Sequence, residues 1–121
     1  MRKNVKLYEL AHARTGDKFN TSLIAVLPYF EEHLELLRGI LTAEYVQSAF
    51  RDIVRGMVER EETPYGFIFV LHAALDGGVV AGLRHDKHGK SLSGIMLDLD
   101  IPVPLDFQVP TLEEIQARLD S

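Results

Sequence analysis

Residues 13–22, ARTGDKFNTS, place charged and hydrogen-bonding side chains around a single glycine. Arg14 and Lys18 could hold a phosphate or a carboxylate, and backbone N–H groups around Gly16 could extend this into an anion-binding nest. Asp17 could orient Lys18 or accept a proton as a base. The pattern predicts an anion-binding loop at the entrance of the apolar strand that follows.

Asn20 and Thr21 add further hydrogen-bonding groups to the same stretch. A purely structural loop is the competing interpretation. In it, Asp17 caps backbone amides and Arg14 pairs with a carboxylate such as Asp98 or Asp100. Residue types and spacing leave both interpretations open.

His72 is a second candidate for chemistry, because it follows an apolar predicted strand and precedes a Gly-rich turn. A neutral imidazole there could act as a general base or hydrogen-bond a substrate carbonyl. The alternative is a partly buried histidine satisfied by backbone groups. Gly77 and Gly78 of the turn are expected to line the same groove as the stretch 14–18. The candidate catalytic residues are therefore Asp17, Lys18 and His72.

The remaining histidines and one acidic run are expected to do no chemistry. His85 and His88 lie three positions apart in a predicted turn, which is a weak metal-binding pattern without further ligands. We therefore expect no metal site and no cofactor. His12 and His33 are expected to be surface residues, and residues 59–62 a solvated strand edge.

Length and composition indicate one globular domain. The chain has 121 residues, of which 46% are hydrophobic and 26% charged, with a formal net charge of −5. Its 13 basic residues are scattered among 18 acidic ones, which argues against nucleic-acid binding. No cysteine, no apolar run long enough to span a membrane and no signal-peptide pattern is present. We expect a cytoplasmic protein that does not bind membranes.

Hydrophobic periodicity predicts the order of strands and helices. Strands are expected over 5–11, 23–27, 57–62 and 67–75, and helix over 30–56, with a break at Gly39, a cap at Thr42 and an end at Gly56. The sequence pattern over 79–101 favours a hairpin, although a helix over 91–98 fits the same apolar spacing. Residues 111–120 predict a short helix with a capping box from Thr111 to Glu114.

This order of elements favours an α+β fold. The economical arrangement is a mixed or antiparallel sheet with helices on one face, and the nearest common fold is the ferredoxin-like two-layer sandwich. We expect the domain over 1–102, followed over 103–121 by a proline-bounded arm and the short helix. Because the arm shows no packing pattern of its own, it and the helix are expected to contact a partner.

Five segments resemble the small domain of the acyclic terpene utilisation (AtuA-like) proteins. They are LYELAHARTGDKFNTS, LTAEYVQSAF, VEREETP, FVLHAALDGGV and LRHDKHGKSLSGIMLDLDI, within residues 5–102. The family pattern Ala-x-x-Arg-Ser-Gly-Asp-Lys-Gly, then Asn or Asp, then Thr is matched by Ala11, Arg14, Gly16, Asp17, Lys18, Asn20 and Thr21. Phe19 replaces the second glycine of that pattern, and Ala73 and Asp76 replace two glycines of the family's Gly-rich stretch.

The resemblance implies a ferredoxin-like fold and a place in the breakdown of acyclic terpenes and related branched acids through coenzyme A thioesters. It also implies a small subunit that joins a larger AtuA-like chain in a homo- or hetero-oligomer, with an acyl-CoA or a carboxylate as ligand. Two alternatives stay open. One is a catalytic lyase or hydratase subunit acting on a thioester through Asp17, Lys18 or His72. The other is a ligand-free homo-oligomer in which the stretch 13–22 only closes the fold.

Overall fold

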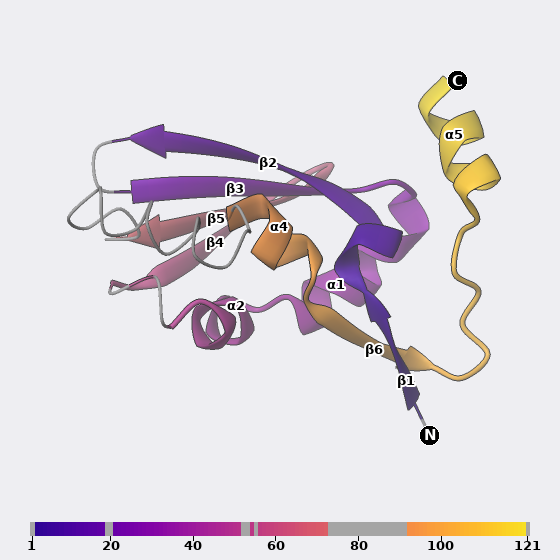
Figure 1. Cartoon of the computed structure of the whole chain (residues 1–121), viewed down its shortest axis with the longest axis horizontal. Helices are drawn as coiled ribbons and strands as arrows, with labels where there is room; N and C mark the ends of the chain where they lie inside the picture. The colour runs from indigo at the N-terminus through magenta and orange to yellow at the C-terminus, as the bar shows by residue number, and fades with distance from the viewer. Residues whose placement is uncertain (1, 19–20, 52–53, 55, 73–91, 121) are drawn as a thin grey trace.

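The computed structural model describes residues 2–18, 21–51, 54, 56–72 and 92–120, and its main feature is a four-stranded antiparallel sheet (Figure 1). The strands of this large sheet are β2 (Ala11–Lys18), β3 (Thr21–Pro28), β4 (Val58–Thr63) and β5 (Gly66–His72), in the order β2-β3-β5-β4. A separate two-stranded antiparallel ribbon pairs β1 (Arg2–Lys6) with β6 (Asp100–Pro104).

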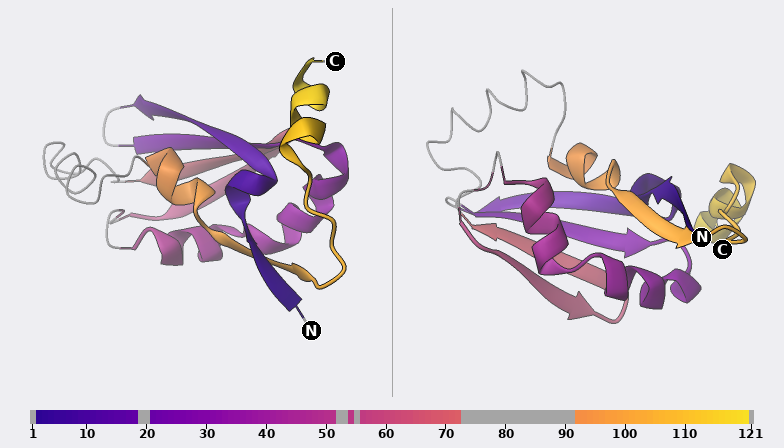
Figure 2. Two further views of the ribbon diagram at one scale, coloured as in Figure 1. Left: turned by 45° about the vertical axis from the view of Figure 1, so that its right-hand side comes forward. Right: turned by 90° about the horizontal axis from the view of Figure 1, so that it is seen from below.

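The helices are short, and most of them gather on one face of the large sheet. They are α1 (Leu34–Ile40), α2 (Ala43–Ala49), α4 (Leu92–Leu97) and α5 (Leu112–Asp120), with the 3-10 turns η1 (Leu7–Glu9) and η2 (Glu31–His33). Helices α1, α2 and α4 and the β1–β6 ribbon lie on one side of the large sheet, whereas α5 stands beyond its end (Figure 2). No helix within the described ranges is long and apolar enough to cross a membrane.

The succession β3, α1–α2, β4, β5, α4 reproduces most of a ferredoxin-like unit. Strand β5 lies between β3 and β4, as the third strand of that fold lies between the first two. Strand β2 occupies the outer position beside β3, because β6 pairs with β1 instead. The predicted α+β, ferredoxin-like sandwich with helices on one face is confirmed, with a short helix α4 where the second helix of the fold would lie.

Alternation along the inner strands builds the core. Every second side chain of β3 and β5 points to the helix-covered face and is buried, because successive residues of a strand face opposite sides. These side chains are Ile24, Val26, Phe67, Phe69 and Leu71, and they pack with Leu37, Val46, Phe50 and Met96 from the helices. The domain therefore has one core on one side of the large sheet.

The prediction of one continuous strand over 5–11 is wrong, because the strand is interrupted in its middle. Strand β1 ends at Lys6, and β2 begins at Ala11 after the tight turn η1. The turn is closed by the N–H of Leu10, which donates to the carbonyl of Leu7 at 2.9 Å. Leu7 and Leu10 are both fully buried, so the turn lets two residues of one apolar run point into the core.

The end predicted for the second helix is also wrong. Helix α2 begins as expected, since the Thr42 hydroxyl accepts from the N–H of Tyr45 at 3.1 Å, but it ends at Ala49. Gly56 instead continues toward β4, and its N–H donates to the carbonyl of His72 at 3.0 Å. A Cβ atom at Gly56 would lie 2.7 Å from that same oxygen, so the close approach to β5 requires glycine.

The C-terminal third departs from the expected hairpin. Residues 92–97 form α4, so the helix considered for 91–98 is confirmed there, while the proposed hairpin turn falls among residues 73–91, outside the described ranges. Strand β6 continues to Pro104, and Phe107 and Val109 pack against the core. The expectation that the arm has no packing of its own is therefore wrong. The domain boundary after residue 102 stays a prediction.

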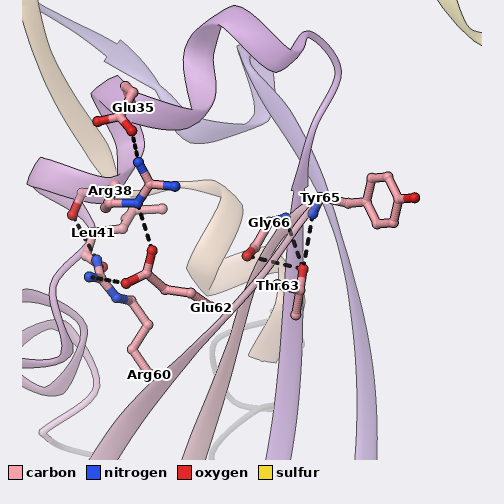
Figure 3. Close-up of polar contacts among 8 residues, drawn as sticks. All are labelled: Glu35, Arg38, Leu41, Arg60, Glu62, Thr63, Tyr65 and Gly66. Atoms are coloured by element: carbon pink, nitrogen blue, oxygen red, sulfur yellow. Dashed lines mark hydrogen bonds and ion pairs between the residues drawn. The ribbon is translucent and has the colours of Figure 1, made fainter.

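A polar network ties α1 to the edge strand β4 (Figure 3). Arg60 donates to the carbonyls of Arg38 and Leu41 at 2.7 and 2.9 Å, which satisfies carbonyl groups at the C-terminal end of α1. Arg38 contacts Glu35 and places its Nε 2.6 Å from Oε1 of Glu62. These contacts hold the last turn of α1 against the sheet.

Candidate functional site

The large sheet has a second face that none of the described helices covers, and the candidate residues collect there. Because side chains alternate, this open face carries the residues next to the buried ones in each strand. We define the open face by His12, Arg14, Gly16, Thr21, Leu23, Ala25, Leu27, Glu59, Glu61, Ile68, Val70 and His72.

Strand pairing brings together two segments that are far apart in the sequence. Lys18 pairs with Thr21 across β2 and β3, and Thr21 pairs with His72 across β3 and β5. The candidate catalytic histidine therefore lies in the same row of the sheet as Lys18, with Thr21 of β3 between them. Among the other predicted ligand-binding residues, Asn20, Gly77 and Gly78 lie outside the described residues, as do His85 and His88.

The expectation of a loop over 14–18 is wrong. These residues form the second half of β2 and pair in regular register, with Arg14 opposite Ala25 and Gly16 opposite Leu23. An anion nest needs backbone N–H groups turned toward one point, which regular antiparallel strand geometry does not provide. Any anion held here would be held by side chains on the open face.

The ion pair suggested for Arg14 is also wrong. Asp98 and Asp100 contact Lys6 instead, with Nζ of Lys6 2.9 Å from Oδ1 of Asp100 and 3.8 Å from Oδ1 of Asp98. The hydrogen bond to Asp100 raises the pKa of Lys6. Arg14 lies on the open face and is exposed, so its guanidinium is accessible to solvent.

His72 contacts the carboxylate of Glu59, a residue that the sequence analysis did not identify as a candidate. Its Nε2 atom lies 2.8 Å from Oε1 of Glu59, and both side chains are about half exposed on the open face. The predicted alternative, a histidine satisfied by backbone groups, does not describe this side chain. Glu59 was assigned to a solvated strand edge. β4 is indeed an edge strand. The alternation of residues along β4, which puts Glu59 on the face opposite to that of Arg60, was the one sequence signal that could have placed Glu59 on the same face as His72.

His12 lies beside Arg14 on the open face, as its position in the sequence suggested. Its ring stacks on Tyr29 with ring centres 5.6 Å apart. Burial, reinforced by the positive charge of Arg14, lowers the pKa of His12. The neutral ring therefore contributes a flat, partly apolar surface at this edge of the sheet.

The surface position expected for His33 is wrong. This residue ends η2 and is only 7% exposed, with its ring against Phe30 and Phe107. Its Nδ1 atom is buried and has no hydrogen-bond partner among the residues described. Burial lowers the pKa of His33, opposed by the negative charge of Glu32.

A shallow pocket of about 320 Å³ lies at the end of the sheet nearest α5. Its walls include Leu27, Tyr29, Leu34 and Tyr65, and Arg118 of α5 closes one side. In the described part of the chain, no three His, Asp or Glu side chains gather in a way that could hold a metal ion. The open face therefore carries a cationic side chain at Arg14, the imidazole–carboxylate pair of His72 and Glu59, and an apolar surface.

An antiparallel sheet covered on one face by short helices, in this order of elements, defines a ferredoxin-like domain. The family model of the AtuA ferredoxin-like domain matches residues 5–102, so the chain belongs to this family. Neither the curated proteins nor the solved structures give a significant match.

Proposed function

We propose that this chain is the accessory component of an AtuA-type system for acyl-CoA or branched-acid breakdown in the cytoplasm. It acts by assembly with a larger AtuA-like chain. Family membership supports the choice of partner, and the observation that carries the assembly role is the exposure of α5.

Helix α5 buries none of its residues against the domain. Leu112 is 86% exposed and Leu119 58% exposed, and with Ile115 they recur at the spacing of one helical face. The helix is preformed, since the N–H of Thr111 donates to Glu114 at 2.9 Å and the Thr111 hydroxyl accepts from the Glu114 N–H at 3.1 Å. A short capped helix with an uncovered apolar stripe suits a groove on another chain.

Co-expression with a larger AtuA-like chain tests the assembly role. We expect the two chains to co-purify, and Leu119→Asp to abolish this because it places a charge in the apolar stripe. Ala117→Asp is the matched control, since it adds the same charge on the opposite side of α5. Failure of the unaltered chains to associate, or equal loss in both variants, would reject the role of α5.

A ligand role for the open face is the second part of the proposal. Lys18 is paired with Thr21 at the end of β2 and β3, and Arg14 lies four positions earlier in β2. An acyl-CoA phosphate or a carboxylate is the anion that we propose for these residues. A thermal-shift titration with coenzyme A, acyl-CoA thioesters and simple carboxylates tests it. We expect a saturable rise in melting temperature that is lost in Arg14→Ala and Lys18→Ala.

A catalytic role is kept as the alternative because of one contact. The 2.8 Å pair of His72 and Glu59 could orient an imidazole for proton transfer on a thioester, with Asp17 and Lys18 as the other candidates. The alternative expects His72→Ala or Lys18→Ala to abolish turnover of the reconstituted complex while the domain stays folded. Full activity in both variants would remove it.

A further inference from the structure

The centre of the open face is apolar, although no described helix covers it. Leu23, Ala25 and Leu27 from β3 and Ile68 and Val70 from β5 occupy it, and Leu23 is 36% exposed. The other four side chains are partly exposed. The buried residues of α1, α2 and α4 belong to the core on the opposite side of the large sheet. A contiguous apolar surface that a domain leaves uncovered is typical of an association site.

The two edges of the open face carry opposite charge. Arg14 projects from the outer strand β2, and Glu59 and Glu61 project from the other outer strand β4. Strand register places Arg14, Ala25, Ile68 and Glu61 in one row across the sheet, since each is the paired residue of the next. The row therefore runs from a cation, over apolar side chains, to an anion.

We propose that the open face is the contact surface of a symmetric dimer, in which a second copy of this chain packs its own open face against it. The two-fold axis lies between the sheets, parallel to the strands and midway between β3 and β5. Rotation about this axis exchanges the two edges of the sheet, so β2 of one copy lies over β4 of the other. Arg14 then faces Glu61 of the second copy, and by symmetry the contact occurs twice.

Charge selects this axis over the other face-to-face arrangement. A two-fold axis across the strands would place β2 over β2 and β4 over β4, so that Arg14 meets a second Arg14 and Glu61 a second Glu61. Like charges brought together in this way oppose association. The axis along the strands instead pairs opposite charges at both edges and joins the two apolar centres, with the sheets stacked about 10 Å apart.

A second copy of this chain is also the partner that best matches the open face. An isologous interface needs one surface that is complementary to itself, and an apolar centre with a positive and a negative edge at the same level meets that condition. The larger AtuA-like chain of the proposed function has its own contact on α5, beyond the end of the sheet. The two surfaces adjoin at the pocket that Leu27 and Arg118 line, but Leu119 is not among the residues of that pocket. Substitutions at Leu119 and at the charged edges of the sheet therefore test the two contacts independently.

Sedimentation equilibrium of the full chain without added ligand, comparing charge variants, tests the dimer. We expect the unaltered chain to dimerise and Arg14→Glu or Glu61→Arg alone to raise the dimer Kd by about tenfold or more, because each change creates two repulsive contacts. The double variant R14E/E61R should return the Kd to within about threefold, since it restores both pairs with their signs exchanged. Glu113→Arg on α5 is the control and should leave the Kd unchanged.

A variant in the apolar centre provides an independent measurement. Val70→Thr keeps a β-branched side chain in β5 but adds a hydroxyl, and it should weaken the dimer without unfolding the domain. A monomeric unaltered chain at the highest attainable concentration would overturn the proposal. So would a dimer that is insensitive to both single charge reversals, or a double variant as weak as the single ones. Leu119→Asp should stay dimeric, so the loss of the larger partner and the loss of the dimer are distinguishable.

Discussion

Nε2 of His72 lies 2.8 Å from Oε1 of Glu59, across the pair of strands β5 and β4. The contact joins two side chains that are thirteen positions apart in the sequence, and both lie on the face that the described helices leave open. It is the one imidazole–carboxylate contact found in the described residues of the open face.

Removing this contact is expected to change stability little. Because both side chains are about half exposed, Glu59→Gln should lower the free energy of unfolding by less than about 1 kcal/mol in urea denaturation. A larger loss would show that the pair has a structural role. The small expected effect makes Glu59→Gln and His72→Ala usable in turnover assays, where loss of activity from a folded domain would favour the catalytic alternative.

Two glycines should respond oppositely to alanine. Gly56→Ala places a Cβ atom 2.7 Å from the carbonyl oxygen of His72, a backbone atom that cannot move alone, and we expect a loss of about 1–3 kcal/mol. Gly39→Ala in α1 meets nothing within 4 Å and should gain about 0.5–1 kcal/mol from helix propensity. Thermal unfolding of both variants measures the difference, and an equal effect of the two substitutions would contradict the close approach at Gly56.

Arg60 should be a main anchor of α1. Arg60→Ala leaves the carbonyls of Arg38 and Leu41 without their charged donor, and we expect a loss of about 2–3 kcal/mol in urea denaturation. Both carbonyls accept from Nη1 of Arg60, so Arg60→Lys keeps a charged donor for them. It loses the contact of Nη2 with Glu62 and the planar group over the Phe67 ring, so it should recover only part of the stability. Full recovery by lysine would indicate that charge alone suffices.

Acidification should destabilise the domain before its carboxylates titrate. The folded-state pKa values of His33 and His12 are lowered, so the folded domain binds fewer protons than the unfolded chain near the ordinary histidine pKa. Stability is fully present above about pH 6.5 and is lost as the pH falls through that value, at up to about 1.4 kcal/mol per pH unit for each group.

Melting temperatures between pH 7.5 and 5.5 measure this dependence. His33→Leu should make it shallower without loss of stability at pH 7.5, because it removes a buried nitrogen that lacks a partner in the described structure. His12→Phe should remove much of the remainder while keeping a ring against Tyr29. A slope unchanged in the double variant would assign the pH dependence to other groups.

Local signals predicted the parts of the fold that depend on neighbouring residues. The Thr42 cap, the capping box at Thr111 and the strand over 67–72 all follow from residues within a few positions of one another. The family pattern predicted the ferredoxin-like fold, because Arg14, Gly16 and their neighbours match it in order.

Features that depend on long-range pairing could not be predicted in the same way. The sequence placed Arg14 in a loop because glycine and aspartate usually break strands, yet pairing with β3 along its whole length keeps β2 extended. His33 was expected at the surface of the predicted helix. Its burial depends on Phe107, which arrives from more than seventy residues away. The contact of His72 with Glu59 likewise depends on the register of β4 and β5.

The β1–β6 ribbon has a consequence for how the domain reaches its native state. Arg2 pairs with Pro104, 102 positions later, and the buried residues Val5 and Ile101 meet in the same ribbon. Pairs so distant in sequence form late and slow the folding reaction, since the intervening chain must first be ordered. During synthesis β1 therefore cannot pair with β6 until residues 100–104 have left the ribosome. A cut or an insertion inside β6 should therefore leave β1 without its partner strand and destabilise both ends of the chain.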